Sequence, residues 1–215
     1  QTFEYWRLKV TNTGSKARKL RAFTYCEFSN QWNTTQDQVN LQYSIFICKG
    51  EKAKENMLRY SIHENLYLQH QKNPAIGDYM SEWMALVGQP MTGYDTDRQS
   101  FIGTYGSYKE PDSVINGECK NSNAYGDNIC GSMQSDIELA PGETKELVVL
   151  LGIGDANVEG EKAVKEFGSI AKCDEEFDKL VKAWHAKLGS LNVKTPDEDI
   201  NHTVNVWGLY NCLIT

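Results

Sequence analysis

The feature that most constrains this chain is a series of short strand-like runs across residues 1–154, with no helical period between them. In residues 4–10, Trp6, Leu8 and Val10 alternate with more polar neighbours, which is the period of a half-buried strand. Strands are predicted at residues 4–10, 19–28, 39–48, 57–63, 82–87, 100–104, 133–139 and 145–153. Such a series favours one large antiparallel β-sandwich over a parallel sheet with crossover helices.

The connection between the first two runs is rich in turn residues. Residues 11–17 (TNTGSKA) predict a hairpin with a loop, so the first two strands are expected to be neighbours in one sheet. Six basic residues face a single acid in the first 21 positions, and solvent exposure on this hairpin is their expected role. They are Arg7, Lys9, Lys16, Arg18, Lys19 and Arg21.

Near Gly154 the period changes to that of helices. One helix is predicted over residues 158–170 and a second over 174–188, which Gly189 closes. The second helix carries an apolar stripe with members three and four residues apart, namely Phe177, Leu180, Val181, Trp184 and Leu188. A stripe of this kind indicates that the helix packs against another element.

The sharpest local signal opens a third helix at Thr195. A threonine N-cap, Pro196 at the first helical position and Glu198 three residues after the cap form a capping box. The helix that follows is apolar nearly all round, which is typical of a helix inside a larger helical assembly. The sequence reaches Thr215 without a cap, glycine or proline, so we expect it to be a piece of a longer protein.

Composition excludes several classes of function. No apolar run is long enough to cross a bilayer, so we expect no membrane partner. The formal charge of −7 argues against nucleic acid, because phosphate backbones are bound by basic surfaces. The six cysteines form no CxxC pair, and free thiols in a reducing compartment are expected. Cys119 and Cys130 flank a polar loop, and a disulfide between them is the one alternative that is kept.

The residues show no catalytic constellation. None of the four histidines, His63, His70, His185 and His202, has metal-ligand spacing to a cysteine or carboxylate, so no metal or cofactor is expected. Asp95 and Asp97 can be read as a paired-carboxylate acid–base system. The favoured interpretation is a polar loop held by Asx-type turns and an ion pair from Arg98 to one of the two carboxylates.

Six aromatic residues at or near expected loops can stack on sugar rings, whose faces are apolar. They are Trp32, Trp83, Tyr94, Tyr105, Tyr108 and Tyr125. Packing in the core or at a subunit interface is the simpler interpretation.

Several segments together resemble glycoside hydrolase family 94, the cellobiose and chitobiose phosphorylases. The runs YWRLKVTNTG (5–14) and KLRAFTYCEF (19–28) resemble the strand–turn–strand of that family's supersandwich, and YDTDRQSFIG (94–103) resembles its DxDRxxFxG segment. NGECKNS (116–122), CGS (130–132), LAPGETKE (139–146) and TPDEDINHTVNVWGLYNC (195–212) follow in the same order. The resemblance covers essentially the whole chain.

The resemblance implies a mainly β fold: an incomplete antiparallel β-supersandwich at 1–154, lacking its N-terminal strands. It further implies a helical linker at 155–194 and the start of an (α/α)6 catalytic barrel at 195–215. The implied reaction is inverting phosphorolysis of a β-linked disaccharide, with inorganic phosphate as co-substrate. The disaccharide is of the cellobiose type, or alternatively of the chitobiose or laminaribiose type. The products for cellobiose are α-glucose 1-phosphate and glucose. The catalytic and phosphate-binding residues are expected beyond Thr215, so no catalytic residue is assigned and substrate-binding residues stay unknown.

The implied partners are the disaccharide, phosphate, the rest of the same polypeptide and a second subunit of a cytoplasmic homodimer. Two other classes of function are kept open. A non-catalytic carbohydrate-binding β-sandwich is suggested by the aromatic residues near loops. A purely structural assembly domain is the second.

Overall fold

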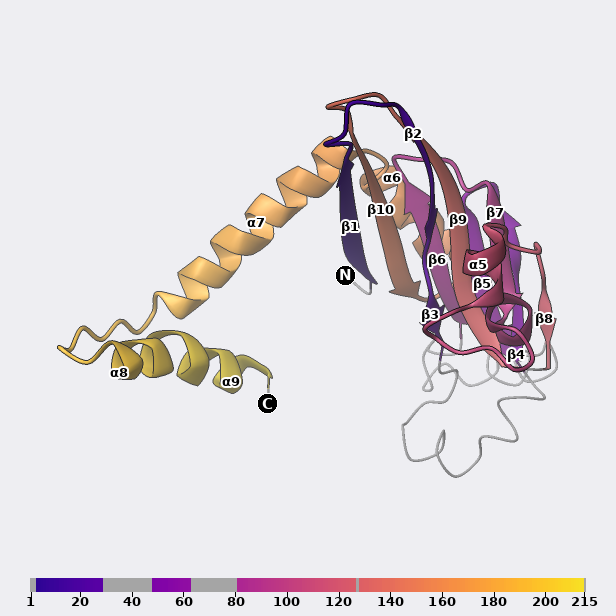
Figure 1. The fold of residues 1–215 in the computed structure, drawn as a ribbon. Coiled ribbons are helices and arrows are strands. Elements are labelled where there is room, and N and C mark those ends of the chain that lie inside the picture. Colours follow the sequence, from indigo (N-terminus) through magenta and orange to yellow (C-terminus); the bar gives the residue numbers. More distant parts are fainter. Residues whose placement is uncertain (1–2, 29–47, 63–80, 127, 215) are drawn as a thin grey trace. The chain divides into compact units, whose positions relative to one another are not determined.

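In a computed structural model, the chain divides into two compact units, residues 1–170 and 171–215 (Figure 1). The structure describes residues 3–28, 48–62, 81–126 and 128–214. The first unit holds all the described strands and the second holds helices. The predicted division at 154/155 and 194/195 stays a prediction.

The first unit contains a six-stranded antiparallel sheet. Its strands are β1 (Phe3–Thr11), β4 (Cys48–Lys54), β5 (Met57–Ile62), β6 (Ser81–Val87), β8 (Ala124–Tyr125) and β10 (Thr144–Ile153). They follow one another in the order β1-β10-β6-β5-β4-β8, so β1 and β8 are the edges among the described strands. The apolar runs predicted at 4–10, 57–63, 82–87 and 145–153 are thereby confirmed as strands.

A second antiparallel sheet lies over the first. It contains β2 (Arg18–Phe23), β3 (Cys26–Glu27), β7 (Gly93–Asp97) and β9 (Ile129–Leu139), and β9 pairs with each of the other three. The run predicted at 133–139 belongs to β9, and the one at 19–28 divides into β2 and β3. Of the run predicted at 39–48, only Cys48 is described, at the start of β4. The expected mainly antiparallel β fold is confirmed.

The hairpin predicted for the first two strands is wrong. β1 pairs with β10 in one sheet and β2 with β9 in the other, so residues 12–17 cross between the sheets. The turn from β9 to β10 makes the same crossing beside it (Figure 1). The turn residues were read correctly, but their composition says nothing about which sheet the second strand joins.

Asn12 ties the two crossings together. Its side chain is buried and its Nδ2 donates to the carbonyls of Lys16 (2.8 Å), Leu139 (3.1 Å) and Ala140 (3.1 Å). Its backbone N–H donates to the carbonyl of Glu143 at 2.9 Å. One side chain therefore satisfies backbone acceptors on both connections, which an apolar residue at this position would leave without a partner.

The core lies between the two sheets and is formed by inward-facing positions of both. Leu58, Tyr60, Met133 and Leu139 are fully or almost fully buried there. The basic residues near the N-terminus project outward and pair with acids of the neighbouring strands: Arg7 and Lys9 with Glu146, Lys19 with Glu138, and Arg21 with Asp136. Their predicted exposure to solvent is confirmed, although not on a hairpin.

A short helical segment covers the outer face of the six-stranded sheet. It consists of a π-helical turn η2 (Ala156–Gly160) and α6 (Glu161–Glu166), where one helix was predicted over 158–170. Trp83 of β6 is fully buried beneath Gly160, where an added Cβ would lie 3.2 Å from the indole. Phe167 packs edge-on to Phe3 with ring centroids 4.9 Å apart.

The second unit begins with α7 (Ile170–Leu188), which starts four residues earlier than predicted and ends before Gly189 as predicted. It is followed by α8 (Glu198–His202), a π-helical turn η3 (Thr203–Gly208) and α9 (Leu209–Ile214). None of the described helices is both long and apolar enough to cross a bilayer.

The predicted capping box at Thr195 is wrong. Asp197 is the N-cap of α8, and its carboxylate accepts from the backbone N–H groups of Asp199 (2.9 Å) and Ile200 (3.3 Å). Thr195 is held two residues upstream by Asn201, whose Oδ1 accepts from the Thr195 N–H at 2.7 Å. Aspartate and threonine both serve as caps, and the side-chain amide of Asn201 decides between them here by fixing Thr195 outside the helix.

Candidate functional site

The segment singled out by its two aspartates is a strand followed by a helix, rather than a loop. β7 pairs with β9, and the pairing shifts register between Asp95, which is opposite Ser132, and Asp97, which is opposite Ile129. A bulge of this kind bends the strand and changes the direction of the side chains that follow it. Asp95 and Asp97 consequently have separate surroundings.

Asp95 is fully buried and accepts hydrogen bonds from four donors. They are Ser113 Oγ (3.0 Å), the backbone N–H groups of Lys120 (3.1 Å) and Ser122 (3.1 Å), and Ser122 Oγ (2.8 Å). The carboxylate therefore fixes residues 113–122 on the sheet. With both oxygens engaged inside the protein, it has no acceptor left for a substrate.

Thr96 joins the two sheets at this point. Its Oγ1 lies 2.8 Å from the carbonyl of Gly50 in β4 and 3.1 Å from that of Ser122, and accepts from the Ala124 N–H at 2.9 Å. A Cβ on Gly50 would lie 2.9 Å from the Cβ of Thr96. Glycine is required there because the strand passes so close to the threonine.

Asp97 is the N-cap of α4 (Arg98–Ile102). It accepts from the Gln99 N–H at 3.0 Å and from Ser100 Oγ at 2.7 Å, which confirms the predicted Asx-type turn. The strand predicted at 100–104 is wrong, because this cap starts a helix that buries Phe101 against the second sheet. Neither aspartate has the surroundings of a general acid, so the structural interpretation of the pair is the one that the geometry supports.

Arg98 pairs with Glu27, not with either aspartate as predicted. Its Nε donates to Glu27 Oε1 at 2.9 Å and its Nη2 to the Tyr108 hydroxyl at 3.1 Å. The hydroxyls of Tyr108 (2.8 Å) and Tyr25 (2.6 Å) donate to the same Glu27 oxygen. We call Tyr25, Glu27, Arg98 and Tyr108 the Glu27 cluster. The sequence missed Glu27, which lies 71 positions from Arg98 and has no local signal that links the two.

The Glu27 cluster keeps its charges fixed at neutral pH. Partial burial raises the pKa of Glu27, but hydrogen bonds from Tyr25, Tyr108 and Arg98 outweigh burial and lower it. Hydrogen bonds to Tyr108 and Glu27 raise the pKa of Arg98 further, and burial followed by the Glu27 contact raises the pKa of Tyr25. A permanently charged pair with two phenols is suited to holding the β3 and α4 segments together, and not to proton transfer.

All six cysteines are free, and this closes the question left open for Cys119 and Cys130. Cys119 lies near Ser132 Oγ (3.8 Å), and Cys130 near the carbonyl of Asp95 (3.6 Å). Burial, with the charge of Asp95 adding to it, raises the pKa of Cys119 to about 12 and also raises that of Cys130. Both thiols are therefore protonated and poor nucleophiles at neutral pH.

The aromatic and histidine candidates fall into three groups. Trp83 is a core residue of a strand, so its assignment to a loop is wrong, and Trp32, His63 and His70 lie outside the described residues. Tyr105, Tyr108 and Tyr125 are exposed, and Tyr94 is half-buried beneath Lys52. His185 and His202 are exposed on α7 and α8. Across the described part of the chain, no three metal-ligating side chains come together.

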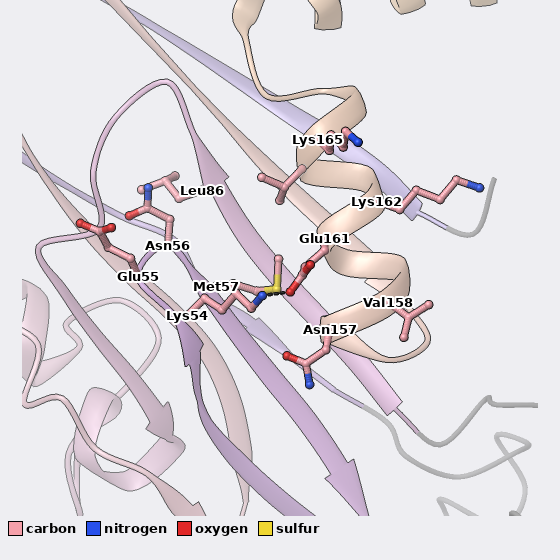
Figure 2. A pocket seen from close by; sticks show the side chains of 11 residues that line it. Lys54, Glu55, Asn56, Met57, Leu86, Asn157, Val158, Glu161, Lys162 and Lys165 are labelled. Atoms are coloured by element: carbon pink, nitrogen blue, oxygen red, sulfur yellow. Dashed lines mark ion pairs between the residues drawn. The ribbon is translucent and has the colours of Figure 1, made fainter.

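An open groove of about 730 Å³ lies between the β4–β5 turn and the segment formed by η2 and α6 (Figure 2). Lys54 and Glu161 form an ion pair across it, and Met57 and Leu86 contribute its apolar part. Figure 2 shows Lys162 pointing away from this pair. Among the described residues that line the groove, none is an aromatic on which a sugar ring can stack.

These features define an antiparallel β-sandwich domain in which polar clusters hold loops to the sheets. Comparison with known proteins identifies the family: residues 1–170 match the supersandwich domain of glycosyl hydrolase 94. The chain belongs to this family.

Several relatives with curated functions are phosphorylases. The N,N'-diacetylchitobiose phosphorylase of Vibrio furnissii is 27% identical over 96% of this chain. The solabiose phosphorylase and the 3-O-β-D-glucopyranosyl-β-D-glucuronide phosphorylase of Paenibacillus borealis are 25% and 24% identical over 95% of it. The chain spans 24–25% of the length of these three relatives.

Proposed function

We propose that the chain is the sandwich-containing part of an inverting disaccharide phosphorylase. The supersandwich match over residues 1–170, together with phosphorylases that align with 95–96% of the chain, carries this proposal. The sandwich serves as scaffold, and the catalytic and phosphate-binding residues belong to parts of the parent polypeptide other than residues 1–215. That assignment stays a prediction.

The chemistry explains which groups the parent enzyme has to supply. A phosphate oxygen attacks the anomeric carbon while the glycosidic C–O bond breaks, and a carboxylic acid transfers its proton to the departing oxygen. The products are the α-sugar 1-phosphate and the released sugar. Phosphate is already an anion, so it requires cationic and hydrogen-bonding partners instead of a general base. Asp95 and Asp97, the pair considered for this role, are already engaged as hydrogen-bond acceptors within the sandwich.

The substrate belongs to the class of β-linked disaccharides, with cellobiose as our first choice and chitobiose and laminaribiose as alternatives. The relatives are named for chitobiose, solabiose and a glucosyl-glucuronide. They support phosphorolysis in general and leave the sugar to be determined. We also propose a cytoplasmic homodimer; the six free thiols favour a reducing compartment.

The experiment is a phosphate-dependent assay on two proteins, the 215-residue chain and the full polypeptide encoded by its gene. With cellobiose, N,N'-diacetylchitobiose, laminaribiose and solabiose as a panel, we expect the full polypeptide to release an α-sugar 1-phosphate from one of them and the 215-residue chain to release none. Omission of phosphate is the control. Activity of the purified 215-residue chain, confirmed by its intact mass, would contradict the placement of the catalytic residues. A full polypeptide inactive on the whole panel and on other β-linked disaccharides would contradict the phosphorylase itself.

Glycan binding by the sandwich alone is the second candidate function. The observation in its favour is the exposure of Tyr105 and Tyr125, whose side chains are 100% and 66% accessible. Affinity electrophoresis in gels that contain a β-glucan tests it: retarded migration that is lost in Tyr125→Ala or Tyr105→Ala supports binding. Equal migration with and without the glucan excludes it.

A further inference from the structure

Two asparagines on the helices of the second unit hold the segment that precedes those helices by its main chain. Asn205 of η3 accepts a hydrogen bond from the Val193 N–H at 2.7 Å, and its Nδ2 donates to the Val193 carbonyl at 2.8 Å. Asn201 of α8 makes the same pair of bonds to Thr195, at 2.7 and 3.0 Å. Each side-chain amide thereby satisfies both main-chain groups of one residue, as a neighbouring strand does in a β-ladder. We call residues 191–196 the strap.

The spacing of the two contacts fits an extended chain that lies along one face of a helix. Asn201 and Asn205 are four residues apart, so they share a face and are separated by about 6 Å along the axis. Val193 and Thr195 are two residues apart, which is about 6.6 Å in an extended chain, and their N–H and C=O groups point to the same side. The earlier residue of the strap meets the later asparagine, so strap and helix run antiparallel. The two amides therefore give the helix the hydrogen-bonding pattern of a sheet edge.

The two contacts differ in how well they are protected from water. Asn201 is buried, its Oδ1 also accepts from Thr195 Oγ1 at 3.1 Å, and its Nδ2 lies 3.3 Å from Glu198 Oε2. Asn205 is half-buried. Water competes more readily for hydrogen bonds that are closer to the surface, and local opening begins at such bonds. We therefore expect the Asn205–Val193 contact to open first.

We propose that Asn201 and Asn205 form a latch, and that the helix from Glu198 onward lies back along the strap only while this latch is closed. The closed state has four hydrogen bonds between side-chain amides and the main chain of the strap. In the open state, the strap is exposed and the helix is joined to it through Pro196 and Asp197. The inference concerns a conformational device, and it holds whether or not the parent protein is a phosphorylase.

Hydrogen exchange of the native 215-residue chain, resolved to single amides by nuclear magnetic resonance, gives the first test. The N–H groups of Val193 and Thr195 are donors in the latch, whereas that of Lys194, between them, points to the opposite side of an extended chain. We expect slow exchange at Val193 and Thr195 and fast exchange at Lys194, with Thr195 the slowest of the three. Exchange of all three amides at the same rate would overturn the proposal.

Trypsin gives the second test, because its one target bond in the strap, Lys194–Thr195, lies between the two contacts. When reclosing is fast, the rate of cleavage follows the population of the open state. Asn205→Leu removes both bonds to Val193 and is expected to raise the rate of cleavage at Lys194 roughly tenfold to hundredfold. Asn205→Asp keeps the acceptor for the Val193 N–H and loses the donor to its carbonyl, so we expect an intermediate increase.

His202→Ala is the matched control, since it replaces an exposed side chain of α8 next to Asn201 and should leave the rate of cleavage unchanged. Far-ultraviolet circular dichroism establishes that each variant keeps its helices, and the exchange test requires no variant. A synthetic peptide of residues 188–198 gives the rate for an open strap. A native chain cut at Lys194 as fast as this peptide, or an Asn205→Leu variant cut no faster than the native chain, would contradict the latch.

Discussion

Removing the Asp95 carboxylate should destabilise the sandwich far more than removing the neighbouring Asp97. Asp95 is fully buried and accepts from two backbone N–H groups and two serine hydroxyls. In Asp95→Ala, the serine hydroxyls can rotate toward other acceptors, but the backbone N–H groups of Lys120 and Ser122 cannot. A buried donor left without an acceptor costs about 1–3 kcal/mol, and bonds to a charged acceptor lie at the upper end. We therefore expect a loss of about 4 kcal/mol.

Two further variants separate the contributions. Asp95→Asn keeps one oxygen acceptor but points an NH2 group at donors, so a loss of about 2 kcal/mol is expected. Asp97→Asn keeps the cap of α4, because asparagine caps helices as well as aspartate does, and should cost less than about 0.5 kcal/mol.

The assay is urea-induced unfolding, followed by circular dichroism and tryptophan fluorescence, with the midpoint and slope of each variant compared with the native chain. Two results would refute the reasoning about Asp95. One is a loss below about 1 kcal/mol in Asp95→Ala. The other is equal destabilisation by Asp95→Asn and Asp97→Asn, which would mean that burial and the number of donors have no bearing on the cost.

Three other perturbations follow from contacts described above. The folded-state pKa of Glu27 is lowered, so its contribution to stability is present above the ordinary glutamate pKa of about 4.3 and is lost as pH falls through the folded value. The urea midpoint of the native chain should therefore drop more between pH 6 and pH 3 than that of Glu27→Gln. Parallel pH curves for the two proteins would argue against this role of Glu27. Iodoacetamide at pH 8 should alkylate the exposed Cys212 quickly and leave the buried Cys119 intact until urea is added, as measured by peptide mass spectrometry. Equal rates of alkylation at Cys119 and Cys212 would mean that the surroundings of Cys119 open freely in the folded protein. Trp83→Ala should cost about 3–5 kcal/mol in urea unfolding while Tyr105→Ala changes nothing, and the reverse order would contradict their burial.

Prediction from sequence succeeded where one local pattern decides the structure. β6 and β10 are continuous apolar runs, and α7 has a clear stripe, so period and length were sufficient. It failed at residues 100–104, where the cap from Asp97 outweighs an apolar pattern compatible with a strand. Two caps of similar strength competed at the start of α8, and the contact with Asn201 chose Asp197.

The candidate site was less accessible to sequence reasoning because its contacts are non-local. The Asx-type turn of Asp97 was read correctly, since cap chemistry is local, whereas the partners of Asp95 lie 18–27 positions away along the chain. The partner of Arg98 was not, because Glu27 is brought to it only by the pairing of β3 and β7 with the same strand, β9. The pairing of β1 with β10 was missed for the same reason.

The crossing at Asn12 has a consequence for biosynthesis. The strands on either side of it find their partners only in β9 and β10, with Phe3 opposite Gly152 and Arg18 opposite Leu139. A ribosome adding 5–20 residues per second needs roughly 7–25 s to make the intervening chain. Throughout that interval, β1 and β2 lack the strands with which they pair in the folded sandwich. Chaperones that shield extended apolar segments should therefore raise the soluble yield of this protein, and slower translation should lower it.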